Sequence, residues 1–149
     1  MVTEMSNDRI KHSIKVADTM SKLAAENCER LNIDPDDAFI CGCLHDIGYC
    51  YTDNHSEHNH VGGEILKKLG FKFWEAVYNH GDPDVEFNDN MLILLDYADM
   101  ICGPAGEDLT MDARAEEIRQ RYGESSTVYE RVKRLCDKIQ VEKARLHIT

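Results

Sequence analysis

Apolar residues recur at steps of three and four along almost the whole chain, and this helical period constrains the fold more than any other feature. The first helix is predicted to run from about position 7 to 30, with an apolar stripe formed by Ile10, Ile14, Ala17, Met20, Ala24, Cys28 and Leu31. The sequence shows no period-2 alternation of useful length, which half-buried strands would require. It therefore predicts an all-α fold, a bundle of six or seven helices.

Local signals place several helix ends. Asp34 is a good N-cap, and Pro35 suits the first position of a second helix that runs to about 46. A third helix is predicted in HVGGEILKKLG, ended by Gly70, a short fourth in FKFWEAVYNH and an apolar fifth in MLILLDYADMI. The C-terminal segment 111–146 holds two more amphipathic stretches.

The last of these stretches is predicted to begin with a capping box formed by Thr127 and Glu130. The 149 residues suit a single domain with one core, so we expect 1–149 to be one domain. Neither a membrane span nor a signal peptide is recognisable, which favours a cytoplasmic protein whose six cysteines stay reduced.

The formal net charge of −11 limits the partners that the chain can bind. It repels phosphate backbones at long range, so a nucleic-acid duplex and an anionic membrane surface are disfavoured. A small anionic substrate is compatible with this charge if the site supplies local positive charge. A bound divalent metal is the most compact source of it.

Four of the seven histidines lie in CLHDIGYCYTDNHSEHNH, positions 43–60. Here His45 and Asp46 follow an apolar helix whose end would deliver them to a neighbouring element. The possible partners on other predicted helices are His12, His58, His80 and Asp99. Asp99 interrupts an apolar run, where burial of an unpaired carboxylate would be costly. Imidazoles and carboxylates that converge from several helices favour a divalent-metal site.

Two neighbours of these residues allow more than one interpretation. Lys15, one turn after His12, could meet a substrate phosphate or be solvated. Asp96, one turn before Asp99, could orient a ligand or face solvent. A zinc site is an alternative for Cys41, Cys43 and His45. Because residues two apart project to nearly opposite sides of a helix, core packing of the cysteines is favoured.

Three segments resemble motifs of the HD-domain metal-dependent phosphohydrolases. The first, from His12 to Val16, looks like H-x-x-R/K-V, and Ala38 through Ile47 is similar to A-x-x-x-G-x-L-H-D-I. Met91 through Asp99 is similar to M-x-x-L-x-x-x-A-D. The resemblance covers about positions 9–103 and implies an all-α HD-domain bundle. One divalent metal would be bound by His12, His45, Asp46 and Asp99.

Two further segments resemble a subset of this family that binds a second metal. HNHVGGEIL looks like H-x-x-I/V-G-x-E-I-L, and VYNHG resembles the segment that supplies a second histidine. Gly62 anchors the first match and selects His58, so His55 and His60 are expected to be ordinary loop residues. The pattern is closest to bacterial HD-domain diadenosine tetraphosphate hydrolases, because the loop of the related HD-GYP enzymes is absent after His80.

The resemblance implies a metal-dependent phosphohydrolase that cleaves an ester or anhydride of a small, phosphorylated substrate, most simply a nucleotide. Asp46 would be the catalytic residue and bridge the first metal to a second one held by His58 and His80. A hydroxide shared by the metals would attack phosphorus. These ligands favour iron or manganese, with zinc, nickel, cobalt or magnesium as alternatives. Lys15 is the candidate substrate-binding residue.

Two other functions stay open from the sequence. A mononuclear HD nucleoside monophosphate phosphatase would not need His58 and His80 to converge, and a non-catalytic HD binding module would be expected to lack several ligands. Tyr49 stands where related dinuclear enzymes commonly carry a lysine that faces phosphate. Without that charge, we expect monophosphates or small esters to be hydrolysed at least as well as dinucleoside polyphosphates. Nothing in the sequence indicates an oligomeric state.

Overall fold

The computed structural model describes residues 2–86 and 89–148. These residues form eight α-helices and two 3-10 turns, with no β-strand among them. The helices are α1 (Asn7–Glu26), α2 (Cys28–Leu31), α3 (Pro35–Leu44), α4 (His58–Lys68), α5 (Trp74–Asn79), α6 (Asn90–Ile101), α7 (Met111–Tyr122) and α8 (Thr127–Leu146). The 3-10 turns are η1 (Ile47–Cys50) and η2 (His55–Glu57). The prediction of an all-α fold is confirmed.

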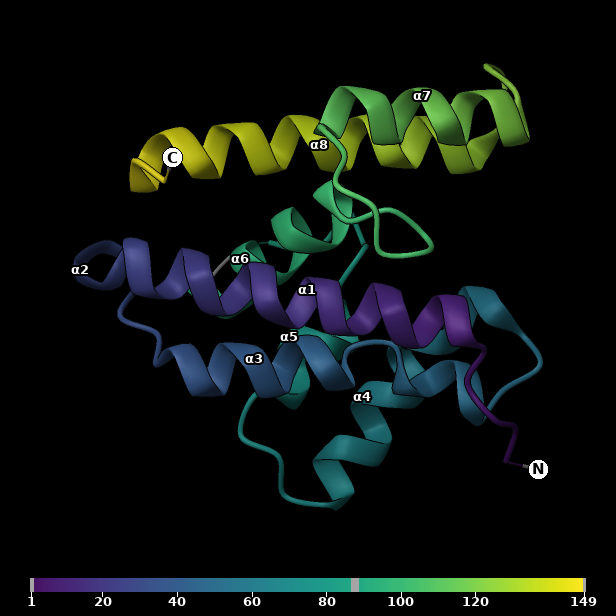
Figure 1. Cartoon of the computed structure of the whole chain (residues 1–149). Helices are drawn as coiled ribbons and strands as arrows, with labels where there is room; N and C mark the ends of the chain where they lie inside the picture. The colour runs from purple at the N-terminus through teal and green to yellow at the C-terminus, as the bar shows by residue number, and fades with distance from the viewer. Residues whose placement is uncertain (1, 87–88, 149) are drawn as a thin grey trace.

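Helix α6 lies between two groups of helices. Figure 1 shows α7 and α8 side by side along one side of the molecule, with α1, α3, α4 and α5 on the other side of α6. The main apolar core joins α6 to α1, α3 and α5, and a smaller cluster formed by Met100, Met111, Leu135 and Ile139 ties α7 and α8 to α6. Because α6 is apolar on almost every side, it can contribute to both clusters.

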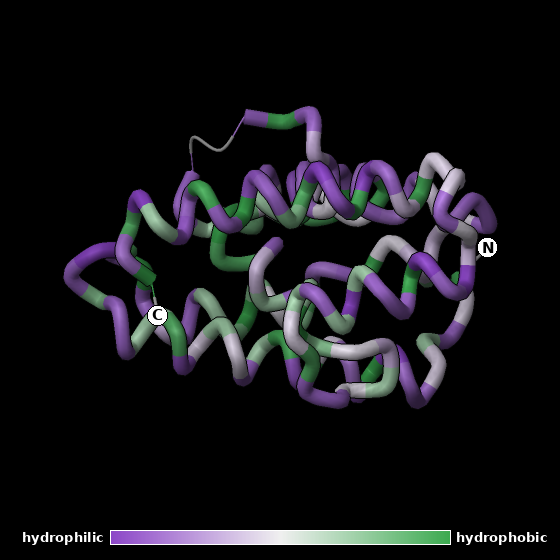
Figure 2. The backbone as a smooth tube through the Cα atoms, turned by 90° about the horizontal axis from the view of Figure 1, so that it is seen from above, coloured by the Kyte–Doolittle hydropathy of each residue, from purple (hydrophilic) through white to green (hydrophobic). Residues whose placement is uncertain are grey.

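Along the longer helices, hydrophobic residues recur among hydrophilic ones, as the sequence pattern predicts (Figure 2). The buried face of α1 nevertheless differs from the predicted stripe, because Ile10 and Ile14 are 41% and 50% exposed. His12 and Ser13 take the inward positions over the first turns, followed by Val16 and other core residues. The predicted buried face was wrong at this end of the helix, because polar site residues face inward there instead of aliphatic ones.

The C-terminal ends of α1 and α3 differ from the predicted ones. The first helix stops at Glu26, since the buried amide of Asn27 donates to the Leu23 carbonyl at 2.9 Å, and the extra single-turn helix α2 follows. This brings the number of α-helices in the described ranges to eight rather than six or seven. Helix α3 stops at Leu44 and not at 46, which leaves Asp46 with φ −102° and ψ 13° just beyond it.

The cap of α8 also lies one residue earlier than the predicted capping box. Ser126, not Thr127, is the N-cap, and its hydroxyl accepts from the Tyr129 amide at 3.1 Å. Glu130 is therefore one residue too late to complete a box and pairs with Arg134 instead. By contrast, the predicted N-cap of α3 is confirmed, because Asp34 accepts from the Asp36 amide at 2.7 Å.

Two glycines allow the backbones around His45 and Asp46 to approach closely. A Cβ atom on Gly42 of α3 would lie 2.5 Å from the Cα of Ala17 on α1. A Cβ atom on Gly48 of η1 would overlap the carbonyl oxygen of His58, the first residue of α4. These contacts hold the end of α3 between α1 and α4. None of the helices in the described ranges is both long and apolar enough to cross a bilayer.

Candidate metal centre

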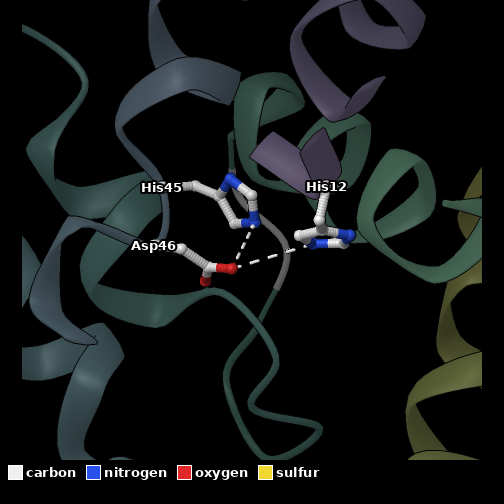
Figure 3. Close-up of side chains that lie close together, drawn as sticks. All are labelled: His12, His45 and Asp46. Carbon is white, nitrogen blue, oxygen red and sulfur yellow. Dashed lines mark ion pairs between the residues drawn. The ribbon is translucent and has the colours of Figure 1, made fainter. Parts of the chain in front are cut away.

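Six imidazole and carboxylate side chains converge at one end of the main core. They are His12 from α1, His45 and Asp46 from the end of α3, His58 from the start of α4, His80 directly after α5, and Asp99 from α6. In Figure 3 the carboxylate of Asp46 faces the rings of both His12 and His45. His45 is fully buried, and His12, Asp46 and His80 are each at most 4% exposed.

The two carboxylate oxygens of Asp46 face different pairs of histidines. Oδ2 lies 3.3 Å from Nε2 of His45 and 3.7 Å from Nε2 of His12. Oδ1 lies 3.5 Å from Nε2 of both His58 and His80. Asp99 belongs to the first group, since its Oδ1 lies 2.8 Å from Nε2 of His12 and 3.4 Å from Nε2 of His45. Asp46 thus stands between two sets of potential metal ligands.

The four histidines share one hydrogen-bonding arrangement. Each Nδ1 lies 2.5–2.8 Å from a backbone carbonyl oxygen: Gly103 for His12, Gly42 for His45, His55 for His58 and Val77 for His80. A carbonyl can only accept, so each Nδ1 donates its proton. In a neutral ring the lone pair is then on Nε2, the atom that points into the cluster. Such outer hydrogen bonds fix the tautomer and orientation of metal-binding histidines.

The spacing of these atoms fits divalent metal ions. Ligand atoms on bonds of about 2.1 Å lie about 3.0–3.4 Å apart around an octahedral or tetrahedral ion. Nε2 of His58 and Nε2 of His80 are 3.2 Å apart. Nε2 of His45 is buried and has no hydrogen-bond partner among the described residues, although buried nitrogen atoms are normally satisfied. A cation between these groups would satisfy them.

The charges in the cluster also favour cation binding. Burial alone would raise the pKa of Asp46, but the charge of His45 and the contacts with His58 and His80 hold it well below its usual range. The pKa of Asp99 is lowered in the same way, against burial, by His45 and His12. Both carboxylates are therefore ionised at neutral pH. Burial lowers the pKa of His45, yet Asp46 and Asp99 outweigh it and raise the pKa, so protons compete with metal.

Asp96 supports the histidine that follows α5 and does not face solvent. It is 1% exposed, and its Oδ1 accepts from the Gly81 amide at 2.7 Å, which ties α6 to the turn directly after His80. Burial raises the pKa of Asp96 to about 7. Its Oδ2 has no hydrogen-bond partner in the described parts of the chain. Of the two interpretations that the sequence left open, the structure favours orientation of a ligand.

Tyr49 occupies the edge of the cluster together with an arginine that sequence reasoning missed. The Tyr49 ring stacks on the His58 ring, with centroids 4.0 Å apart and an angle of 18° between the planes. The guanidinium of Arg9 covers the Tyr49 ring at 3.4 Å from its centroid, and its Nη1 lies 3.1 Å from Oδ2 of Asp46. Arg9 precedes His12 by one helical turn, so the i, i+3 spacing was the available signal.

The other candidates lie outside the cluster. The Lys15 ammonium pairs with the exposed carboxylate of Asp108 at 2.9 Å and does not line the cavity described below. His60 pairs with Glu57 at 2.9 Å on the surface, and His55 lies in η2. Burial raises the pKa of the Cys41 thiol to about 12, so this residue would be a poor thiolate ligand for the alternative zinc site.

A cavity of about 530 Å³ opens from the cluster. His12, Asp46, His58, His80 and Asp99 line it on one side. Helices α7 and α8 line it on the other side, where three arginines, Arg114, Arg121 and Arg131, contribute. The sequence motifs gave no reason to place this C-terminal pair at the site, because its residues come together only through tertiary packing.

The family model of the HD domain matches residues 9–142. The helical fold carries a cluster of histidines and aspartates that could hold a metal ion, and this match, which covers most of the chain, shows that the chain belongs to the HD-domain family. The match extends through α7 and most of α8, beyond the segment that carries the motifs. It does not support the closer relationship to diadenosine tetraphosphate hydrolases. Searches of curated proteins and of solved structures returned no match.

Proposed function

We propose that this protein is a dinuclear metal-dependent phosphohydrolase that cleaves a phosphate ester or anhydride of a small nucleotide. One observation carries the proposal: the two oxygens of Asp46 face two separate histidine pairs at 3.3–3.7 Å. A carboxylate in this position suits a bridge between two ions. HD domains are generally metal-dependent phosphohydrolases, so membership of the family and the geometry of the site point in the same direction.

The residues divide into two ligand sets with Asp46 in common. His12, His45 and Asp99 would complete the first, and His58 and His80 the second. Bound divalent ions would polarise the phosphoryl group and lower the pKa of a water molecule. Imidazole and carboxylate ligands favour iron or manganese, while zinc, nickel, cobalt and magnesium are alternatives.

The chain itself contributes order and charge. The backbone carbonyls on each Nδ1 hold the four rings in place before substrate arrives, so little reorganisation is needed during the reaction. The low pKa of Asp46 and Asp99 keeps both carboxylates ionised. Hydrolysis adds water across the P–O bond: the water oxygen bonds to phosphorus, and the leaving oxygen gains a proton.

The cavity supports a small substrate over a macromolecular one. Its volume of about 530 Å³ falls in the range typical of pockets for cofactors and nucleotides. The net charge of −11 disfavours a nucleic-acid duplex and an anionic membrane surface as partners. The finer resemblance to diadenosine tetraphosphate hydrolases remains a proposal, and that compound belongs among the substrates to be tested.

A hydrolysis screen tests the proposed function. Protein loaded with manganese or with iron under reducing conditions is incubated with nucleoside mono-, di- and triphosphates and with diadenosine tetraphosphate, and released phosphate or product is measured. We expect hydrolysis that Asp46→Asn abolishes and that His55→Ala preserves, because His55 is exposed and does not line the cavity. Absence of metal-dependent hydrolysis of every phosphate compound would reject the phosphohydrolase and leave a binding module. Activity that saturates with one ion per chain would favour the mononuclear phosphatase.

A further inference from the structure

Helices α7 and α8 form the side of the cavity opposite the metal ligands, and one face of α7 supplies much of it. Arg114, Ile118, Arg121 and Tyr122 all line the cavity. Their spacing of i, i+4, i+7 and i+8 places them on one face of the helix. This face therefore presents two guanidinium groups beside apolar and aromatic surface to anything bound at the metal ligands.

The two arginines share one carboxylate. Nη1 of Arg114 lies 3.2 Å from Oε2 of Glu117, and Nη2 of Arg121 lies 2.9 Å from Oε1 of the same residue. Their guanidinium groups can therefore reach a common anion, and two positive charges are compensated by one negative charge. In addition, Nε of Arg114 is buried and lacks a hydrogen-bond partner within the described ranges. Both features leave capacity for a second anionic partner.

Arg131 on α8 differs from these two arginines. It pairs with both Asp82 and Asp84, at 3.3 and 3.4 Å, in the loop that follows His80. Its charge is therefore compensated, and it fastens α8 to the opposite side of the cavity. The uncompensated charge on this side lies with Arg114 and Arg121.

We infer that Arg114 and Arg121 select a nucleotide with a second phosphate group, such as a nucleoside diphosphate. The inference rests on the proposed function, because the first phosphate would lie at the metal ligands. Two positive regions in one cavity of about 530 Å³ match two anionic groups on one small molecule. Ile118 and Tyr122 on the same face offer apolar contact to the nucleoside.

This arrangement changes the expectation that followed from Tyr49. The lysine that related enzymes carry is absent, and the sequence therefore favoured compact monophosphates. The structure places Arg9 against Tyr49 and brings Arg114 and Arg121 to the far side of the cavity. Arg114 and Arg121 therefore supply positive charge at another side of the cavity in place of a lysine at position 49. This position of the charge favours substrates that extend across the cavity.

Binding of non-hydrolysable probes tests the inference without relying on turnover. The dissociation constants of adenosine 5′-(α,β-methylene)diphosphate and of the 5′-phosphonate analogue of adenosine monophosphate, in which a P–C bond replaces the P–O ester bond, are measured by calorimetry on metal-loaded protein. The variants are the double substitution Arg114→Gln with Arg121→Gln, and Glu117→Gln. The matched control is Arg119→Gln, because Arg119 lies on α7, pairs with Glu116 and does not line the cavity.

We expect the double variant to bind the diphosphate probe about tenfold or more weakly, with a much smaller change for the monophosphate. Glu117→Gln removes the competing carboxylate and should tighten binding of the diphosphate probe several-fold, which a purely structural role of α7 would not produce. Metal content and melting temperature verify folding. The bisphosphonate analogue of adenosine 3′,5′-bisphosphate, measured in parallel, distinguishes a second phosphate group on the same end of the nucleoside from one on the opposite end.

Equal weakening of both probes, no effect beyond that of Arg119→Gln, or no binding by wild-type protein would overturn the inference. Failure of the proposed function gives a different result. If wild-type protein hydrolyses no phosphate compound while the diphosphate probe still binds through Arg114 and Arg121, the recognition of two phosphates stands and the catalytic proposal falls. Hydrolysis of nucleotides that is indifferent to both arginines gives the reverse conclusion.

Discussion

Nε2 of His58 and Nε2 of His80 lie 3.2 Å apart, each on a ring whose Nδ1 donates to a backbone carbonyl. Two neutral imidazoles in this arrangement direct lone pairs at each other. The contact is unfavourable unless a proton or a cation lies between them. Oδ1 of Asp46 lies beside both nitrogen atoms, and a second metal ion held by these three atoms would remove the unfavourable contact.

We therefore expect purified protein to bind about two divalent ions per chain, and His58→Ala to bind about one. The partly exposed His58 is preferred for this test, because truncation of the buried His80 would also leave a cavity in the core. Metal content is measured by mass spectrometry after purification without chelators. His60→Ala is the control for the loop, and saturation of wild-type protein at one ion would contradict the prediction.

Asp46→Asn should reduce kcat by about 10³-fold or more, since residues that act as one catalytic unit lose most activity when one is removed. It should also lower bound metal, because the amide keeps the shape of the side chain and removes the charge that both ligand sets share. Steady-state kinetics and metal analysis of the same preparation test this. Near-normal activity of Asp46→Asn would show that the carboxylate does not bridge the metals.

Asp96 predicts a specific pH dependence of stability. Its folded pKa of about 7 lies above the ordinary value of 3.8, so the stability associated with this group is complete below that ordinary value and is lost as pH rises to about 7. Asp96→Asn removes this loss. In chelator-treated protein, the melting temperature of the variant relative to wild type should therefore rise from about pH 4 to about pH 7, and this difference should stay constant above pH 7. A melting-temperature difference between Asp96→Asn and wild type that does not change anywhere in this pH range would contradict the prediction.

The observed cap of α8 leads to a stability prediction. Because the Ser126 hydroxyl accepts from the Tyr129 amide, Ser126→Ala should destabilise the protein by about 1 kcal/mol. Thr127→Ala should cost much less, since Thr127 is not the N-cap. Urea denaturation of both variants compares them directly. A larger loss in Thr127→Ala would restore the capping box that the sequence favoured.

Gly42→Ala should disturb both the fold and the site. The added Cβ would lie 2.5 Å from the Cα of Ala17, so α1 and α3 must separate, at a cost of about 1–3 kcal/mol. Because α1 supplies His12 and α3 delivers His45, metal affinity should fall as well. Cys43→Ala, at the next and half-buried position, is the control. Unchanged melting temperature and metal affinity in Gly42→Ala would show that the contact tolerates a methyl group.

The sequence by itself determined the helical fold and the identity of the cluster residues. Periodicity specified helices because their apolar faces must be buried whatever their partners, and the spacing around His45, Asp46 and Gly62 singled out the residues that the structure brings together. Local hydrogen bonding set finer details. The Asn27 side chain ended α1, and Ser126 rather than Thr127 capped α8.

Only the tertiary structure decided what surrounds the cluster. The inward face of α1 carries His12 where an apolar stripe was expected, because the site occupies that end of the core. The pairing of each Asp46 oxygen and the approach of Arg114 and Arg121 join segments that are far apart in the chain. Helical period reports which side of a helix is apolar, but not which helix packs against it. The charge on the far side of the cavity therefore follows from the packing of α7 and α8 on α6, which no local pattern records.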